Sequence, residues 1–224
     1  MINALRTGNL QAFLISLLLS LPIILLSLSV HEVAHGYAAY KLGDPTAKNL
    51  GRLSLNPIKH LDPIGFICML LCGFGWANPV PINTRYFKKP KRDMAITGAA
   101  GPISNLVLAF IFAVLARVTE IMYVVLPPSI SLWDTFYTLI FLFFQIGVSI
   151  NITLAVFNLI PVPPLDGSRI FLGFLPTDTY FKIMRYERYI SFALMIALFL
   201  GLLDTPIDFV SNIFYRLIEL MIPF

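Results

Sequence analysis

Two histidines and a glutamate stand within five positions of one another, as His31, Glu32 and His35 in the stretch HEVAH. On a helix, residues i and i+4 share a face, so both imidazoles can bind one Zn²⁺ ion. Glu32 lies beside the first histidine and can act as general base toward a water molecule at that ion. The pattern therefore predicts a metal-dependent hydrolytic centre. The alternative is an ordinary polar turn at the point where a helix leaves a membrane.

A catalytic zinc ion needs a third protein ligand, and three residues are candidates. His60 and Asp62 lie in the charged stretch NPIKHLDP, where we expect solvated loop residues. Asp166 lies in PVPPLDGSR, where the prolines end a helix. We expect Asp166 at the same membrane depth as the histidines, which favours it as the third ligand. Its alternative role is that of a turn or helix N-cap residue before Gly167.

The composition places these residues in a membrane protein. Hydrophobic residues make up 58% of the 224 positions and charged residues 12%, whereas soluble domains carry about 25% charged residues. Stretches of about 20 apolar residues can span a bilayer as helices. We expect one domain over residues 1–224, an all-α polytopic membrane protein without a cleavable signal peptide. The expected spans are residues 10–40, 94–117, 132–160 and 188–203, with residues 206–222 as either a span or an interfacial helix.

One uncharged stretch does not fit a simple spanning helix. Residues 63–84 carry no charge but contain several glycines and prolines. Val80 and Ile82 suit short strands, and the prolines around them are compatible only with an edge strand. Irregular backbone at membrane depth needs protein or a water-filled cavity to satisfy its polar groups. We therefore expect the helical bundle to include a membrane-dipping β-hairpin at residues 63–87, lying against a cavity.

The basic residues indicate the orientation of the bundle. Lysines and arginines gather in three segments, residues 41–62, 85–93 and 166–188. Cytoplasmic loops of membrane proteins are enriched in these residues. We therefore expect the HEVAH stretch and residues 158–167 to lie toward the cytoplasm. The same loops account for the net charge of +4, and no basic–aromatic pattern points to nucleic acid as a partner.

Further motifs accompany HEVAH along the chain. GAAGPISN occupies residues 98–105, and N-x-x-P-x-P-x-x-D-G occupies residues 158–167. Together the three motifs resemble the site-2 protease family of intramembrane zinc metalloproteases. GRLSLNPIKHLDPIG at residues 51–65 and WANPVPINTRYF at residues 76–87 resemble the compact bacterial branch of that family. The similarity extends from about residue 20 to residue 175.

With the orientation that the basic residues indicate, we expect a multi-pass protein of the cell membrane with its active site toward the cytoplasmic side. The resemblance implies one Zn²⁺ ion per chain, bound by His31, His35 and Asp166, with Glu32 as catalytic base. The implied substrates are transmembrane segments of membrane-anchored proteins or remnant signal peptides, cut within the lipid bilayer in regulated intramembrane proteolysis. We expect no PDZ or CBS domain, which family members often carry, because no hydrophilic stretch is long enough for either.

For substrate binding, the resemblance implies four further residues. Asn158 would help to hold the substrate backbone near the metal, and Asn105 would be a substrate-side or site-lining residue. Residues 74–87 match the membrane-dipping β-hairpin of the family, whose edge pairs with an extended substrate strand. Val80 and Ile82 would then contact substrate.

Two other classes of protein carry similar residues. A metal or proton transporter also places His, Glu and Asp inside the membrane, but such proteins often contain internal repeats with paired broken helices. The sequence contains no second copy of HEVAH or of N-x-x-P-x-P-x-x-D-G. An inactive relative that binds membrane substrates is the other alternative, and the presence of His31, Glu32, His35 and Asp166 argues against it.

Overall fold

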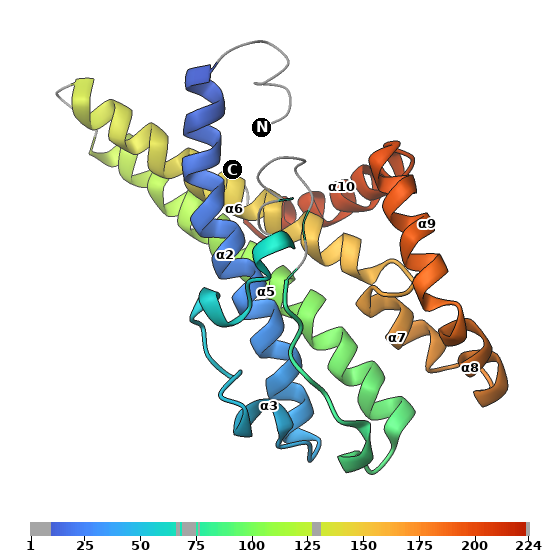
Figure 1. The fold of residues 1–224 in the computed structure, drawn as a ribbon. Coiled ribbons are helices and arrows are strands. Elements are labelled where there is room, and N and C mark those ends of the chain that lie inside the picture. Colours follow the sequence, from blue (N-terminus) through green and yellow to red (C-terminus); the bar gives the residue numbers. More distant parts are fainter. Residues whose placement is uncertain (1–9, 66–67, 69–74, 76, 127–130, 223–224) are drawn as a thin grey trace.

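The computed structural model describes residues 10–65, 68, 75, 77–126 and 131–222 of the chain. Three long helices dominate this part of the protein (Figure 1), namely α2 (Leu10–Lys41), α5 (Pro90–Val125) and α6 (Ser131–Leu159). Each is longer than the roughly 20 residues that cross a bilayer, and each contains an apolar segment long enough to do so. The composition therefore predicted the main architecture correctly: a mostly helical protein with at least three helices able to span a membrane.

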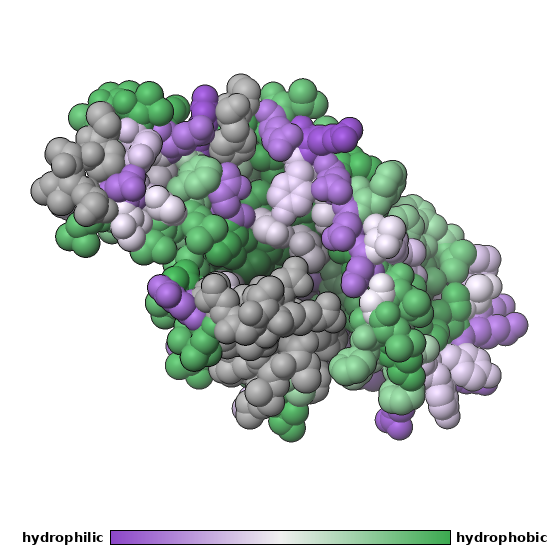
Figure 2. Space-filling view, turned by 90° about the horizontal axis from the view of Figure 1, so that it is seen from above, coloured by the Kyte–Doolittle hydropathy of each residue, from purple (hydrophilic) through white to green (hydrophobic). Residues whose placement is uncertain are grey.

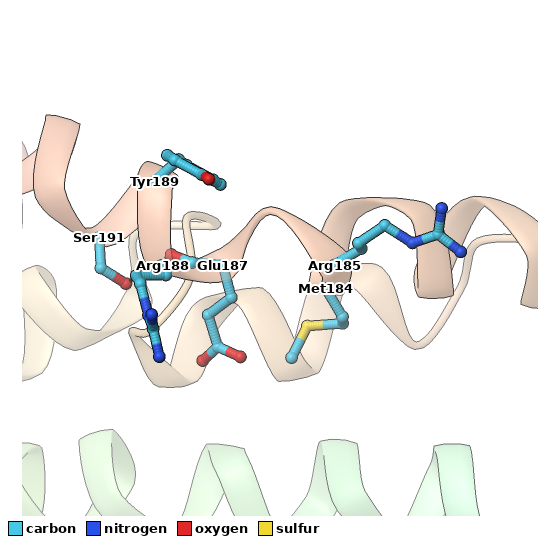
Figure 3. Close-up of a pocket in the computed structure, with 6 residues that line it drawn as sticks. All are labelled: Met184, Arg185, Glu187, Arg188, Tyr189 and Ser191. Carbon is cyan, nitrogen blue, oxygen red and sulfur yellow. Dashed lines mark hydrogen bonds between the residues drawn. The ribbon is translucent and has the colours of Figure 1, made fainter.

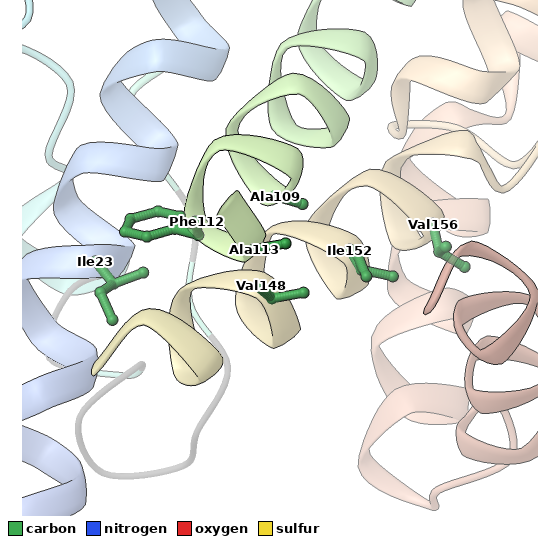
Figure 4. Packing of buried hydrophobic residues seen from close by; sticks show 7 residues of the cluster. All are labelled: Ile23, Ala109, Phe112, Ala113, Val148, Ile152 and Val156. Carbon is green, nitrogen blue, oxygen red and sulfur yellow. The ribbon is translucent and has the colours of Figure 1, made fainter. Parts of the chain in front are cut away.

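The three long helices share one buried apolar cluster, and α5 packs against both α2 and α6 (Figure 4). Because lipid tails are as apolar as these side chains, helices in a bilayer associate through close van der Waals packing. Gly147 of α6 permits such packing, since a Cβ atom there would lie 2.6 Å from the ring of Phe112. The cluster consists of Ile23, Ala109, Phe112, Ala113, Val148, Ile152 and Val156.

Shorter helices follow α6, and they are α7 (Asp166–Leu172), α8 (Thr177–Arg185), α9 (Glu187–Phe199) and α10 (Asp204–Met221). With 13 residues, α9 rises only about 20 Å, which is less than the apolar thickness of a bilayer. α9 and α10 together have enough apolar length for a span, but they meet at an angle of 83°. Residues 188–203 and 206–222, which the sequence suggested as separate elements, thus form a bent pair of helices.

Apolar side chains cover much of the outside of the bundle. Leu18, Val107 and Leu132 are each more than half exposed. In the view from above, Figure 2 shows hydrophobic residues over much of the coloured surface and hydrophilic residues gathered mainly in a band across it. Such an extensive apolar surface would be unfavourable in water, whereas a bilayer accommodates it.

The predicted β-hairpin at residues 63–87 is not supported by the part of this stretch that the structure describes. Residues 66–67, 69–74 and 76 lie outside the described residues. In the remainder, residues 63–65 are helical and Thr84–Tyr86 form a 3-10 turn. An isolated antiparallel bridge joins Leu61 to Ala77, and none of the described residues of the stretch forms a strand.

In the described part of this stretch, side chains that favour strands stand beside prolines. Val80 and Ile82 have the side chains that favour strands, but Pro79 and Pro81 stand beside them and donate no hydrogen bond. The N–H that lies between the prolines, that of Val80, is bonded to the carboxylate of Glu32 and not to a neighbouring strand. Side-chain propensity therefore gave the wrong prediction, because it does not show which acceptors the backbone N–H groups will find.

Residues 78–83, here called the strap, are instead held by single hydrogen bonds to other parts of the chain. The N–H of Asn78 donates to the carbonyl oxygen of His60 at 2.7 Å. The N–H of Asn83 donates to the carboxylate of Asp44, also at 2.7 Å, and Asp44 is fully buried. The strap is thus fixed near both ends to the segment that follows α2.

The close packing at Gly147 leads to a prediction about stability. We expect Gly147→Val to lower the free energy of unfolding by about 1–3 kcal/mol, because the added methyl groups would overlap the Phe112 ring and overpack the cluster. Thermal unfolding of the purified protein in detergent measures this effect. Thr153→Val, at an exposed position of the same helix, is the matched control and should unfold like the unchanged protein. Equal stability of both variants would show that the helices are loosely packed here.

Candidate metal centre

The histidines of HEVAH and Asp166 meet in the structure, although 131 positions separate His35 from Asp166. The Nε2 atoms of His31 and His35 lie 3.0 Å apart. Oδ2 of Asp166 lies 3.0 Å from the first of these nitrogens and 3.1 Å from the second. Within the described residues, this is the one group of His, Cys, Asp or Glu side chains close enough to share a metal ion.

Two local features bring the three side chains together. His31 and His35 are one helical turn apart on α2, so their rings point to the same side. Asp166 begins α7, just after the chain has turned back beside the end of α6. Gly167 allows this close return, because a Cβ atom there would lie 2.2 Å from the carbonyl oxygen of Leu159. The glycine of the L-D-G sequence thus helps to place the carboxylate that precedes it.

The hydrogen-bond partners of the two rings determine which nitrogen carries the proton. Nδ1 of His35 lies 2.7 Å from the carbonyl oxygen of Thr97, which can only accept, so this Nδ1 is a donor. Nδ1 of His31 lies 2.6 Å from Oδ1 of Asn105, again an acceptor. In their neutral forms, both rings therefore present an unprotonated Nε2 to Asp166.

Three electron-pair acceptors consequently point at one another in a buried place. Two unprotonated nitrogens and a carboxylate oxygen repel at about 3 Å unless a positive charge lies between them. Two imidazoles and one carboxylate form a typical ligand set of catalytic zinc, which leaves a fourth position open. The residues present therefore fit a zinc ion.

The backbone of α5 closes one side of the centre. Gly101 lies against the histidines so closely that a Cβ atom there would be 2.4 Å from Nε2 of His35 and 2.6 Å from Cε1 of His31. Any larger residue at this position would occupy the space of the ligand atoms. The GAAGPISN motif thus contributes two residues to the centre. The backbone of Gly101 packs against the imidazoles, and Asn105 forms a hydrogen bond with His31.

Glu32 is buried beside the centre and is held by the strap. Its Oε2 accepts the N–H of Val80 at 2.7 Å. Because Pro79 and Pro81 have no N–H, Val80 provides the one backbone donor among residues 79–81. Val80, for which the family resemblance implied substrate contact, therefore directs its amide to Glu32, and its side chain is buried.

The other residues implied in substrate binding lie in different surroundings. Asn105 is fully buried behind His31, which agrees with a site-lining role and leaves no surface for substrate. Asn158 is partly buried near the end of α6, where its Nδ2 donates to the carbonyl oxygen of Leu154 at 2.9 Å. Ile82 lies in the strap and is partly buried.

The competing ligand candidates are not at the centre. His60 was expected to be solvated, and this prediction was wrong: the side chain is 2% exposed, and Nε2 donates to the carbonyl oxygen of Ser54 at 2.7 Å. Asp62 accepts the N–H of Gly65 at 2.7 Å. Both residues therefore stabilise the loop after α2.

A surface cavity elsewhere in the molecule holds none of these residues. It lies at the junction of α8 and α9 (Figure 3), with Arg188 and Glu187 directed to the same side and Arg185 directed away. Its lining residues are Met184, Arg185, Glu187, Arg188, Tyr189 and Ser191. The metal centre, in contrast, lies where α2, α5 and α7 meet.

Three residues at the centre were missed by sequence reasoning. Thr97 acts through its backbone carbonyl, for which no side-chain signal exists. Gly101 acts through the absence of a side chain. Asn151 of α6 is fully buried and binds Asn105, and its position within an apolar run is the signal that could have revealed it.

The sequence model of peptidase family M50 matches residues 19–202, which include HEVAH, Asn105 and Asp166. The chain belongs to peptidase family M50. No solved structure matches the chain.

Curated relatives of this M50 chain agree with that assignment. YwhC of Bacillus subtilis, named as a candidate zinc metalloprotease, is 44% identical over 176 residues, which cover 79% of this chain and 77% of YwhC. Rip2 of Mycolicibacterium smegmatis, named in the same way, is 30% identical over 64% of this chain and 52% of its own length. The zinc metalloprotease MJ0392 of Methanocaldococcus jannaschii is 28% identical over 90% of this chain, but the match covers 46% of MJ0392.

The close approach of Gly101 generates a prediction about metal binding. We expect Gly101→Ala to lower zinc occupancy at least tenfold, because the new methyl group would displace the rings of His31 and His35. Metal analysis of the purified protein measures the effect. Gly173→Ala is the matched control, since its Cβ atom would meet no neighbour closer than 3.3 Å. Full zinc occupancy of Gly101→Ala would show that the rings can move away from α5.

Proposed function

We propose that this M50 chain is an intramembrane zinc endopeptidase of the site-2 protease type, with zinc bound by His31, His35 and Asp166. The observation that carries the proposal is the convergence of three unprotonated acceptor atoms at 3.0–3.1 Å on helices that are apolar enough to lie in a bilayer. The family and the names of its relatives support the same activity.

A zinc ion in such a centre supplies a Lewis acid that polarises a carbonyl group and acidifies water. Glu32 accepts the proton of the attacking water and then returns it to the amine that leaves. Its second oxygen, Oε1, is available for this transfer because Oε2 is engaged by the Val80 amide. The strap thereby fixes the direction in which the carboxylate points.

The substrates are transmembrane segments of membrane-anchored proteins or remnant signal peptides. His31 and His35 stand toward the Lys41 end of α2, which leads directly into the basic segment at residues 41–62. We assign this end to the cytoplasmic side on that basis. Asn158, eight positions before Asp166, holds the backbone of the unwound substrate through its side-chain amide.

Transport of a metal or a proton is the alternative function, and the geometry around Glu32 argues against it. A transporter needs groups along a path, whereas Glu32 is fixed by one backbone amide directly beside a three-ligand centre. That arrangement is useful for general-base catalysis and unnecessary for conduction.

The direct test of the proposed function is Glu32→Gln. The variant should retain zinc, because Glu32 is not a ligand, but cleave a membrane-anchored model substrate about a hundredfold more slowly or worse, the usual scale of general-base catalysis. Zinc content and cleavage are measured on the same purified sample. Asp166→Ala is the contrasting variant and should lose zinc as well as activity. Undiminished cleavage by zinc-loaded Glu32→Gln would contradict the assignment of the base.

A second test concerns the amide that holds Glu32. Val80→Pro removes this donor and should slow cleavage about ten- to hundredfold, since a hydrogen bond to a charged group contributes about 1.5–3 kcal/mol. Zinc content should not change. Val80→Ala keeps the N–H while it removes most of the side chain, and it should therefore retain most of the activity. If both variants lost activity equally, the side chain and not the amide would be the essential part.

A further inference from the structure

Asn151 is an unusual residue for the middle of a membrane-spanning helix. It lies in α6, is fully buried, and its side chain forms hydrogen bonds with Asn105 and Gly147, neither of which is a metal ligand. A polar side chain in such surroundings is unfavourable unless its hydrogen bonds are satisfied, and those of Asn151 are. Its partners connect it to the metal centre.

A continuous series of hydrogen bonds runs from α6 to the first ligand. Nδ2 of Asn151 donates to the carbonyl oxygen of Gly147 at 2.9 Å. Oδ1 of Asn151 accepts from Nδ2 of Asn105, also at 2.9 Å. Oδ1 of Asn105 then accepts from Nδ1 of His31 at 2.6 Å. The series therefore spans three helices and ends at the ring that binds the metal.

The direction of this series is determined at its far end. The two ends of an asparagine amide have nearly the same shape, so only hydrogen-bond partners decide which end points where. The carbonyl of Gly147 can only accept, which turns Nδ2 of Asn151 toward it and Oδ1 toward Asn105. Asn105 must then direct its own Nδ2 to Asn151 and its Oδ1 to His31.

We infer that Asn151 is a positioning residue for the metal centre: through Asn105, it holds His31 in the tautomer that presents an unprotonated Nε2 to zinc. The inference rests on the proposed function, because it concerns the zinc site of that function. His35 needs no such residue, since a backbone carbonyl, that of Thr97, fixes its Nδ1 as donor. His31 is therefore the ligand whose tautomer depends on side chains.

Loss of Asn151 would remove the hydrogen bond that fixes the orientation of the Asn105 amide. The remaining acceptor near Nδ2 of Asn105 is the carbonyl oxygen of Ser27 at 3.5 Å, which is at the limit of a hydrogen bond. The Asn105 amide can then turn over and donate to Nδ1 of His31. The proton of that ring would move to Nε2, the atom that should bind zinc.

The primary experiment measures zinc affinity by competition with a chelator on the purified full chain. We expect Asn151→Leu, which is similar in size but cannot accept, to weaken zinc binding about tenfold, the lower end of the effect of residues behind metal ligands. Asn151→Asp keeps the acceptor and should bind zinc within threefold of the unchanged protein. Thr119→Val is the matched control for removing a buried polar group from a spanning helix, and it should have no effect.

A double variant distinguishes the effect on amide orientation at residue 105 from a loss of packing at residue 151. Both oxygens of Asp accept, so in an Asn105→Asp chain the proton stays on Nδ1 of His31 whatever occupies position 151. Adding Asn151→Leu to Asn105→Asp should therefore cause no further loss of zinc affinity. A tenfold loss in this background as well would mean that Asn151 acts through packing, and the inference would be wrong.

The tautomer itself can be observed by ¹⁵N NMR of histidine-labelled protein without zinc, in mildly alkaline buffer where imidazoles are neutral. The chain has three histidines, and the structure predicts the Nδ1–H form for His31 and His35 and the Nε2–H form for His60. Asn151→Leu should convert His31 to the Nε2–H form. An unchanged spectrum together with unchanged zinc affinity would overturn the inference while the proposed function stands, whereas failure of the unchanged protein to bind zinc would overturn both.

Discussion

The repulsion among three buried acceptor atoms is the constraint on which the rest of the structure depends. Nε2 of His31, Nε2 of His35 and Oδ2 of Asp166 repel one another in the absence of a cation, and their burial limits how far solvent can screen that repulsion. Three helices must hold them in place before the metal binds. The protein therefore needs a rigid frame around the centre more than it needs any single strong interaction within it.

That frame consists of close contacts and of hydrogen bonds from fixed groups. The backbone of α5 lies directly against the imidazoles at Gly101, so the rings cannot move toward that helix. A carbonyl group and an asparagine hold the far sides of the two rings. Each contact uses an atom whose position is set by a helix, which is how a membrane protein obtains precision without the hydrophobic effect between its helices.

The sequence predicted which three side chains meet at the centre but not the groups that support them, for physical reasons. His31 and His35 follow from helical spacing, and Asp166 follows from the expected depth of the end of α6. Those arguments need only side-chain chemistry and periodicity.

The groups that support the ligands depend on backbone positions and loop conformation, which residue types alone do not reveal. Thr97 contributes a backbone oxygen, and the burial of His60 depends on the fold of an irregular loop. The hairpin prediction relied on the side chains of Val80 and Ile82, whereas the N–H of Val80, which lies between two prolines, is bonded to Glu32 and not to a neighbouring strand.

The strap that forms in place of the hairpin has a mechanical consequence. Because Val80 joins the strap to Glu32, any motion that lifts this segment from α2 also releases the carboxylate. Displacement of the strap is therefore coupled to the orientation of the Glu32 carboxylate, so the proposed function predicts that a force on the strap would change the rate of hydrolysis while the metal stays bound.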